Sequence, residues 1–567
     1  MHEVTEPSPR SEITNVAAHL PRVAAAQPFA PAIYFPDGVD RRGRVRYTHL
    51  TYRQLDESSD AISRGLREAG IAPGTRVALM VRPSLELFSS VFGLFKAGLV
   101  PVMIDPGIGL ASMKACLATA RPEVFIGIWQ AHAARVVLGW AKHSVKTTIL
   151  VGPPAPTITH TLTQIERLGA RSREAAVVPT ERDDLAAILF TSGSTGPPKG
   201  VVYTHGNFLA QTDAIRRMYG ITPGEIDLPT FPLFALFDPA LGMTTVIPDM
   251  DPTRPAKADP KKIARAVEDF GVTNMFGSPA LLDTLSRYGE RTGHRLPSLR
   301  RVISAGAPVP TKVLARMRGM LDDRAEIVTP YGATECLPVS SIESREVLDD
   351  TAKRTAEGAG TCVGRPVPEA EVQVIAIDDG PIARWSDARV LGPHEVGEIV
   401  VKGAQATRRY WDAPEHTAKA KIADGDAVRH RMGDLGYFDD DGRLWFCGRK
   451  SQRVVGASRS WFTGRVEGVF DAHREVRRSA LVGVRGEPVV CVELERGGGA
   501  SERLIGELRE MAERFEATRG LTRFVVHPGF PVDIRHNAKI RREELGRWVE
   551  GRSVGGRGVE GRKEDRT

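Results

Sequence analysis

The chain has 567 residues, of which 41% are hydrophobic and 26% are charged, so a wholly disordered or fibrous protein is excluded. At about 150 residues per domain, this length corresponds to roughly four domain-sized units, which can bury several cores without disulfides or a structural metal. The formal net charge is +7, but basic and acidic residues are mixed through most of the chain. No Lys/Arg stripe interleaved with aromatic residues is visible, so we expect no nucleic-acid-binding function; the positive balance suits an anionic substrate.

The cysteines and the apolar segments indicate a soluble protein of a reducing compartment. The five cysteines are scattered and never form a CxxC pair, which disfavours a disulfide framework or a zinc site. The first residues, MHEVTEPSPR, lack the basic-then-apolar pattern of a secretion signal. Apolar windows such as 91–104 are interrupted by Lys96 or by Gly and Pro and are too short to span a bilayer. We therefore expect no transmembrane segment and a cytoplasmic location.

Helix-like and strand-like segments alternate through most of the chain. The first series has strand-like runs at 76–81, 100–105, 124–128 and 147–151, with helix-like segments that include 84–97. The second series has strand-like runs at 185–190, 272–276 and 299–304, with helix-like segments at 261–270 and 279–289. This alternation predicts an α/β fold in which helices cover both faces of parallel sheets.

The pattern changes after about residue 365 to short strands separated by turns, at 371–377, 396–403 and 442–446. This part predicts a β-rich subdomain. A boundary is expected near 448–453, followed by a separate unit of about 100 residues, which is an ordinary domain length. The final stretch, GRSVGGRGVEGRKEDRT, is basic and Gly-rich and is predicted to be a disordered tail.

The strand-like run 185–190 leads directly into TSGSTGPPKG, residues 191–200. A strand that enters a Gly/Ser/Thr-rich turn directs several backbone N–H groups and hydroxyls at one point, which suits a phosphate. Lys199 adds a mobile cation for the same anion. Gly200 follows this lysine, so the hydroxyl of a Walker A loop is missing. The alternative is a flexible Gly-Ser loop.

Two further segments follow strand-like runs. SAGAPVP (304–310) has small residues that let a planar ring or a phosphate approach the backbone, although by itself it is typical of a tight turn. In TPYGATE (329–335), Tyr331 offers a ring for stacking on a base. A carboxylate next to a phosphate site needs an intervening cation, so Glu335 is a candidate magnesium ligand; an isolated Glu is otherwise a surface residue.

Two segments near the carboxyl end complete the set. In HRMGDLGYFDDDGRLWFCGRK (430–450), Asp434 is suited to paired sugar hydroxyls, and Arg449 to the same sugar or a phosphate. A turn residue is the alternative for Asp434. In DIRHNAKIRREEL (533–545), Lys539 has several arginines nearby, and a basic solvated helix start is the alternative.

These five segments, in this order, resemble those of the adenylate-forming superfamily of acyl-CoA synthetases, firefly-type luciferases and peptide-synthetase adenylation domains. LTYRQL (50–55) and LFKAGLVPVMIDP (94–106) are similar to early signature segments of that superfamily. The resemblance implies a large amino-terminal domain of two α/β subdomains plus a β-rich subdomain, and a small mobile α+β domain beyond a hinge near Lys450 and Ser451. The implied divisions are a flexible terminus at 1–14, the ATP- and acyl-binding domain at 15–448, the mobile domain at 449–550 and a disordered tail at 551–567.

The resemblance also assigns ATP and Mg²⁺ as cofactors. The loop at 191–199 would hold the β- and γ-phosphates, Glu335 the magnesium ion, and Lys539 would bridge the substrate carboxylate and the α-phosphate. The implied catalytic residues are Lys539, Glu335 and Thr191. The implied nucleotide-binding residues are Thr191, Ser192, Gly193, Ser194, Thr195, Gly196, Lys199, Gly306, Ala307, Pro308, Tyr331, Gly332, Ala333, Thr334, Asp434, Arg449 and Lys539.

Residues 226–256, YGATECLPV and PVDIRHNAKI resemble a narrower group, the olefin β-lactone synthetases of bacterial long-chain hydrocarbon synthesis. That resemblance implies adenylation of a long-chain 2-alkyl-3-hydroxy fatty acid, whose own hydroxyl then displaces AMP. It also implies a condensing enzyme, a reductase and a β-lactone decarboxylase as partners. The alternative is a long- or medium-chain fatty-acid–CoA ligase, and a non-catalytic nucleotide-binding scaffold is a third reading.

Residue differences from the CoA ligases favour the β-lactone synthetase hypothesis. Those enzymes usually carry a His where this chain has Ala235, and Ser451 and Thr463 also differ from their usual residues near the hinge. Ring closure needs a base for the hydroxyl proton. His205 and Asp238 are candidates, with a structural role as the alternative for each. Apolar residues within 226–256 are expected to line either an acyl channel or a plain core: Phe231, Phe234, Leu236, Phe237 and Met243.

Overall fold

The structure is a computed structural model that describes residues 14–191, 198–231, 234–457, 459–495, 497–532 and 540–554. The chain divides into two compact units, one formed by residues up to 249 together with 407–417, the other by 250–406 together with the residues from 418 onward. The expected domain limits, 1–14, 15–448, 449–550 and 551–567, stay predictions.

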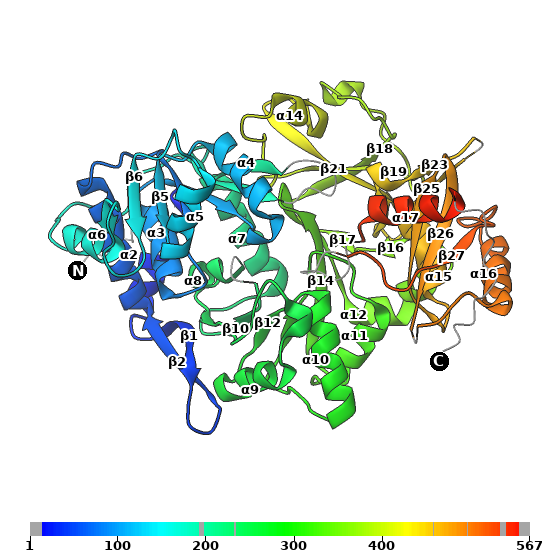
Figure 1. The fold of residues 1–567 in the computed structure, drawn as a ribbon, viewed down its shortest axis with the longest axis horizontal. Helices are drawn as coiled ribbons and strands as arrows, with labels where there is room; N and C mark the ends of the chain where they lie inside the picture. The colour runs from blue at the N-terminus through cyan, green and yellow to red at the C-terminus, as the bar shows by residue number, and fades with distance from the viewer. Residues whose placement is uncertain are drawn as a thin grey trace, which may run out of the picture. The chain divides into compact units, whose positions relative to one another are not determined.

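A seven-stranded sheet forms the centre of the first unit (Figure 1). Its strands are parallel except for the last, which runs antiparallel to its neighbour. In sheet order they are β7 (His160–Thr161), β6 (Thr147–Leu150), β5 (Val124–Gly127), β3 (Arg76–Met80), β4 (Val100–Ile104), β8 (Leu185–Thr191) and β9 (Lys199–Thr204). The central strands are continuous apolar runs because helices cover them on both faces.

The helices of this unit begin at recognisable caps. The side chains of Thr51 and Gln54 form a capping box at the start of α2, and Thr204 with Asn207 does the same for α7. The helices are α1 (His19–Ala26), α2 (Tyr52–Glu68), α3 (Leu85–Lys96), α4 (Leu110–Ala120), α5 (Trp129–Leu138), α6 (Leu162–Gly169), α7 (His205–Tyr219) and α8 (Asp238–Leu241). Four more strands pair in the order β10 (Ile226–Pro229), β11 (Thr244–Val246), β1 (Pro31–Val39) and β2 (Val45–Thr51).

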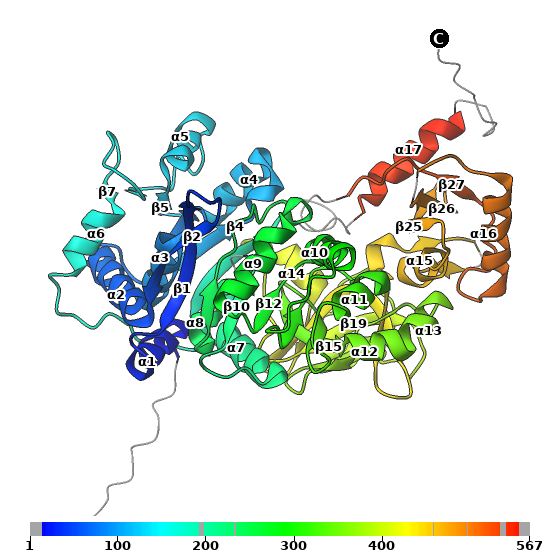
Figure 2. The same cartoon turned by 90° about the horizontal axis from the view of Figure 1, so that it is seen from below.

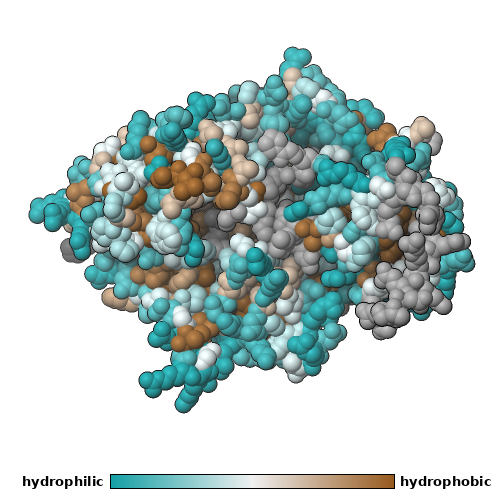
Figure 3. Space-filling view, in the orientation of Figure 1, coloured by the Kyte–Doolittle hydropathy of each residue, from teal (hydrophilic) through white to brown (hydrophobic). Residues whose placement is uncertain are grey.

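The surface of the molecule is largely hydrophilic, with apolar side chains gathered in places (Figure 3). The exposed large apolar residues on α4 and α5 are Leu110, Trp129, Val136 and Val137. No helix of the described residues is long and apolar enough to cross a bilayer. The five cysteines are all buried and free.

The second unit contains a parallel α/β layer and a β-rich layer. The first has β12 (Asn274–Phe276), β13 (Arg301–Ile303) and β14 (Glu326–Ala333) in parallel, followed by the antiparallel β15 (Cys336–Glu343) and β17 (Arg365–Pro366). The longer helices of this region are α9 (Pro260–Phe270), α10 (Pro279–Thr292) and α11 (Thr311–Arg318). The β-rich layer contains β16 (Thr361–Cys362), β22 (Leu444–Arg449), β21 (Ala427–Phe438), β19 (Gly397–Lys402) and β18 (Glu371–Ile375), with β20 (Lys421–Asp424) paired to β21.

Shorter elements connect these layers. In the second unit they are α12 (Ser344–Glu346), the π-helical turn Val347–Thr351, and α13 (Ala352–Ala356), with β23 (Val454–Val455) and β24 (Ser460–Trp461) near the carboxyl end. Residues 414–420 form α14 (Pro414–Ala420).

Residues after about 449 surround a small sheet of β25 (Val476–Val484), β26 (Glu487–Leu494) and β27 (Phe524–Val526). Successive residues of a strand point to opposite faces. Accordingly, Leu481 packs with α15 (Thr463–Asp471) and α16 (Glu502–Arg514), whereas its neighbours Ala480 and Val482 pack with α17 (Arg542–Val554). Figure 2 shows α17 on the side of this sheet opposite to α15. The α/β fold class predicted from the alternation is confirmed.

Candidate active site

Two of the predicted nucleotide-binding motifs lie at the same edge of the second unit's parallel sheet. β13 and β14 are parallel neighbours, and the backbone N–H of Ser304 bonds to the carbonyl of Val328 at 3.0 Å. The segments that follow the two strands, 304–310 and 329–335, therefore emerge side by side. The Ser304 hydroxyl is buried and has no hydrogen-bond partner in the described part of the chain.

Each of these two motifs contains a glycine that its geometry requires. Gly306 has a φ of +93°, a conformation that side chains rarely adopt, and lies with Ala307 and Pro308 in the turn after β13. At Gly332, a Cβ atom would come within 2.9 Å of both the carbonyl oxygen of Cys336 and the Cβ of Leu337. The backbone of the second motif is therefore held close to the strand that follows it.

Tyr331 joins this edge to the β-rich layer. Its hydroxyl donates a hydrogen bond of 2.6 Å to Oδ2 of Asp434 on β21, and its ring lies 6.2 Å from that of Phe446, centre to centre. Residues Ala333 and Thr334 of the same motif are partly exposed. The structure thus brings together two residues that the sequence assigned separately to the adenine and the ribose.

Asp434 is buried, and strand pairing places it opposite Arg449. Nη1 of Arg449 lies 3.1 Å from Oδ1 of Asp434 and also donates to the carbonyl of Met432 at 3.3 Å. Burial raises the pKa of the Asp434 carboxyl, while the Arg449 guanidinium and the Tyr331 hydroxyl act in the opposite direction. The ion pair is misaligned for a hydrogen bond, and Oδ1 has no hydrogen-bond partner among the described residues. This buried acceptor fits a sugar hydroxyl.

Glu335 lies beside a buried lysine that no sequence motif marked. Burial lowers the pKa of the Lys421 ammonium group to about 8, and the nearby Glu335 carboxylate acts in the opposite direction. Lys421 pairs across the sheet with His430, whose pKa burial also lowers. Within the described residues no group of three or more His, Cys, Asp or Glu side chains is arranged to hold a metal. A magnesium ion at Glu335 would therefore take its other ligands from phosphate oxygens or water.

The phosphate-loop motif lies in the first unit. Strand pairing sets Thr191 at the end of β8 opposite Lys199 at the start of β9. The Lys199 ammonium group lies 5.6 Å from the centre of the Tyr410 ring. Ser192, Gly193, Ser194, Thr195 and Gly196 lie outside the described residues, so their predicted roles stay predictions.

His205 is the first residue of α7 and is buried. Its Nδ1 accepts a hydrogen bond of 3.2 Å from the backbone N–H of Val16, and its ring packs edge-on against Phe95. Burial lowers the pKa of this imidazole to about 4, so it is neutral at pH 7. These contacts favour the structural alternative over a role as a base.

Asp238 begins the short helix α8 and is also buried. The hydroxyl of Thr245 donates to its Oδ2 at 2.9 Å. Burial, and then the neighbouring Asp227 carboxyl, raises the pKa of Asp238 well above the usual range. Two carboxyl groups this close share a proton, which suits a packing role better than that of a free base.

The residues expected to contact the acyl chain lie just before α8. Ala235 is fully buried within the 3₁₀ turn Phe234–Leu236. The ring of Phe234 is only partly buried and lies 5.6 Å from that of Phe231, centre to centre. Both rings are partly exposed, whereas a wholly enclosed core would bury them completely. The exposure therefore favours the acyl-channel alternative over a plain core.

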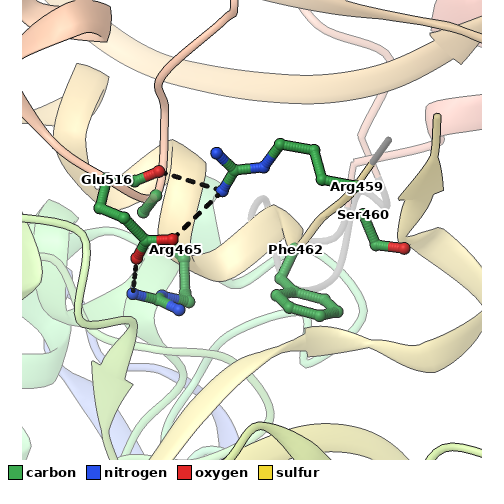
Figure 4. Close-up of a pocket in the computed structure, with 6 residues that line it drawn as sticks. Arg459, Ser460, Phe462, Arg465 and Glu516 are labelled. Carbon is green, nitrogen blue, oxygen red and sulfur yellow. Dashed lines mark hydrogen bonds and ion pairs between the residues drawn. The ribbon is translucent and has the colours of Figure 1, made fainter. Parts of the chain in front are cut away.

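Lys539 lies outside the described residues, and its predicted role stays a prediction. The carboxyl-terminal region does contain a pocket of about 390 Å³, lined by Arg459, Ser460, Phe462, Arg465, Glu516 and Ala517 (Figure 4). Both guanidinium groups face Glu516: Nη2 of Arg459 lies 3.6 Å from Oε1, and Nη2 of Arg465 lies 3.5 Å from Oε2. An anionic ligand in this pocket would have to displace the Glu516 carboxylate.

A comparison of the sequence with protein families gives one decisive match. The model of the family described as "AMP-binding enzyme" matches residues 20–411, which is more than half of the chain. The chain belongs to this family. This match confirms the resemblance of its motifs to the adenylate-forming superfamily.

Individual relatives narrow the comparison. An olefin beta-lactone synthetase of Stenotrophomonas maltophilia (strain K279a) is 52% identical over 546 residues, covering 94% of this enzyme and 98% of the relative. A protein of the same name from Xanthomonas campestris pv. campestris is 51% identical over 549 residues, covering 95% and 98%. The AMP-binding enzyme thus aligns with both relatives over nearly their whole lengths.

Among solved structures, the amide bond synthetase McbA from Marinactinospora thermotolerans resembles this enzyme with a TM-score of 0.75. The two are 23% identical, and the likeness covers 94% of this chain and 99% of the other. At this identity the likeness concerns the fold alone. It confirms the expected fold.

Proposed function

We propose that this AMP-binding enzyme converts a long-chain 2-alkyl-3-hydroxy fatty acid into a β-lactone through an acyl-adenylate, with ATP as co-substrate. The observation that carries the proposal is the identity of 52% with an olefin beta-lactone synthetase, over 94% of this chain and 98% of the relative. The product would enter olefin biosynthesis, and the partners would be a condensing enzyme, a reductase and a β-lactone decarboxylase.

Each unit carries residues that suit a part of the nucleotide. The buried Oδ1 of Asp434 would accept a ribose hydroxyl, with Arg449 beside it and Tyr331 fixing the other carboxylate oxygen. The phosphate loop and Lys199 would bind the β- and γ-phosphates, since cations and backbone N–H groups suit them. Glu335 would hold Mg²⁺, which would supply a hard cation for phosphate oxygens.

The reaction would have two steps. In the first, a carboxylate oxygen of the acid bonds to the α-phosphorus of ATP and pyrophosphate leaves. Because negative charge grows on the transferring phosphoryl group, the Lys539 ammonium would stabilise that transition state. In the second step, the β-hydroxyl oxygen bonds to the acyl carbon, AMP leaves with the bonding electrons, and the hydroxyl proton passes to a base.

The second step needs no external nucleophile. A hydroxyl held in the same pocket as the acyl carbon can have an effective concentration of about 10⁵ M or more when well aligned, which helps to close a strained ring. Fully buried Ala235 stands where CoA ligases usually carry a histidine, so that position supplies no titratable group. Both points favour the lactone over a CoA thioester.

Product analysis tests the proposal against its two rivals. The purified enzyme is incubated with ATP, Mg²⁺ and a 2-alkyl-3-hydroxy acid, with and without CoA, and the products are identified by mass spectrometry. We expect a β-lactone, AMP and pyrophosphate in both reactions. A thioester that forms only with CoA would identify a fatty-acid–CoA ligase. ATP binding without pyrophosphate release, across a panel of acids, would identify a nucleotide-binding scaffold.

A further inference from the structure

The described residues on either side of segment 533–539, which contains Lys539, pair with each other and form a fixed base. Val532 and Ile540 form an antiparallel bridge, and the backbone N–H of Arg541 donates to the carbonyl of Pro531 at 2.8 Å. Ile540, the residue after Lys539, also packs against the core between α17 and the small sheet. The backbone next to Lys539 is therefore fixed relative to that sheet.

Arg542, three residues beyond Lys539, anchors this base to α15. Its Nη1 and Nη2 donate to Oε1 and Oε2 of Glu467 at 2.6 and 2.9 Å, which makes a two-pronged ion pair. The side chains of both partners are only 17% and 15% exposed. A buried two-pronged pair fixes orientation as well as distance, because both guanidinium nitrogens must meet both carboxylate oxygens.

The same two side chains contact other parts of the small domain. Nε of Arg542 donates to Oε1 of Gln452 at 3.1 Å, in the 3₁₀ turn Lys450–Gln452 where the hinge is expected. Oε1 of Glu467 also accepts from the backbone N–H of Leu481 on β25 at 2.8 Å. One buried ion pair thus joins the start of α17, three residues after Lys539, to α15, to the sheet and to the expected hinge.

We propose that Glu467 is a positioning residue for Lys539 and acts through Arg542. This inference rests on the proposed role of Lys539 in adenylation. Loss of the two-pronged contact frees the start of α17 to shift, which moves the ammonium group away from the phosphoryl group. Glu467 itself touches neither ATP nor the acid.

A double-mutant cycle tests this coupling. The variants are Glu467→Gln, Lys539→Ala and the two combined, and the measurement is single-turnover pyrophosphate release with saturating ATP and hydroxy acid. A misplacement of about 1 Å can cost roughly a hundredfold in rate, so we expect Glu467→Gln alone to slow adenylation by about ten- to a hundredfold. The KM for ATP should change little. In the Lys539→Ala background, the same substitution should have no further effect, because the group that it positions is gone.

The chain offers a matched control. Glu544 pairs with Arg541, the neighbour of Arg542, but that pair is exposed at 3.1 Å. Glu544→Gln removes a carboxylate from α17, the helix that Arg542 begins, and should leave the adenylation rate within about twofold of the unaltered enzyme, as expected for an exposed pair. If Glu467→Gln does not fold, as judged by circular dichroism, Arg542→Lys replaces it in the cycle, because it keeps the charge and loses the two-pronged geometry.

The measured rates distinguish failure of the Glu467 positioning role from failure of the proposed Lys539 role. If Glu467→Gln or its replacement slows adenylation equally with and without Lys539, or does not slow it at all, the positioning role is overturned. If Lys539→Ala itself leaves pyrophosphate release unchanged, the proposed role of the lysine fails instead, and this result is visible before the double variant is made.

Discussion

The hydroxyl of Tyr331 donates a hydrogen bond of 2.6 Å to Oδ2 of Asp434, although 103 positions separate the two residues in the chain. This bond joins the sheet edge that carries YGATE to the strand that carries Asp434. The other carboxylate oxygen, Oδ1, is buried and has no hydrogen-bond partner among the described residues, with Nη1 of Arg449 3.1 Å away. The two motifs therefore meet within the second unit, as the proposed nucleotide-binding role requires.

Removal of that hydroxyl tests the arrangement. Tyr331→Phe keeps the ring and deletes the bond, and a hydrogen bond to a charged group contributes about 1.5–3 kcal/mol. We expect the Kd for ATP to rise roughly tenfold or more, measured by calorimetric titration. Tyr437→Phe makes the same deletion on β21, the strand that carries Asp434; it is the control and should leave ATP affinity unchanged. Equal Kd values for both variants would contradict the assigned role of Tyr331.

Lys539→Ala tests the proposed charge stabilisation. A single contact of this kind is commonly worth about 3–4 kcal/mol in a transition state, so acyl-adenylate formation should fall by roughly two to three orders of magnitude. Pyrophosphate release measures this step. Lys142→Ala makes the same change at an exposed position and should have no effect. Unchanged pyrophosphate release in the Lys539 variant would remove this residue from the mechanism.

Gly332→Ala tests the close approach of the YGATE backbone to the next strand. The added Cβ would lie 2.9 Å from the carbonyl oxygen of Cys336, and such overpacking commonly costs about 1–3 kcal/mol. We expect a lower Tm and weaker ATP binding. Gly506→Ala is the matched control: its Cβ has open space on α16, and the exchange should raise helix stability by about 0.5–1 kcal/mol. If both variants lower the Tm equally, close packing at Gly332 is not the cause.

Asp471, at the end of α15, gives the second unit a pH-dependent stability. Burial is the main cause that raises the pKa of this carboxyl from an ordinary 3.8 to about 7. The Glu467 carboxylate adds to this rise, whereas the Ser479 hydrogen bonds and the Arg542 guanidinium oppose it. The folded state thus holds its proton more tightly than the unfolded state. This contribution is complete below about pH 4 and is lost as the pH rises towards 7, at about 1.4 kcal/mol per pH unit.

Asp471→Asn removes this dependence, because an amide does not ionise. The Ser479 hydroxyl, which donates to Oδ1 of Asp471 at 2.8 Å in the unaltered enzyme, can still donate to the amide oxygen. We expect the variant to gain Tm over the unaltered enzyme at pH 8 and to gain less at pH 4.5, measured by thermal unfolding in both buffers. The exposed Asp426→Asn should follow the unaltered enzyme at both pH values. A Tm difference that does not change with pH would contradict the assignment.

The sequence predicted individual residues of the candidate site but not all of its members. Local patterns identified Tyr331, Asp434 and Arg449: Tyr331 and Arg449 follow strand-like runs, and glycines lie close to Asp434 on both sides. Lys421 had no such pattern: it lies beside Glu335 only because β20 pairs with β21 in the folded layer. His205 and Asp238 look like candidate bases in the sequence, but burial leaves the histidine neutral and gives the aspartate a carboxyl neighbour.

The amino-acid sequence by itself determined the α/β class, the order of the strands and helices, and the family, because periodicity and motif spacing are properties of neighbouring residues. Only the tertiary structure decided which distant side chains meet. Glu467 and Arg542 are 75 positions apart, and their ion pair depends on how α15 and α17 pack against opposite faces of one sheet. Contacts of this kind, and the burial that sets the charge of each group, arise from the packing of whole elements and have no local signal in the chain.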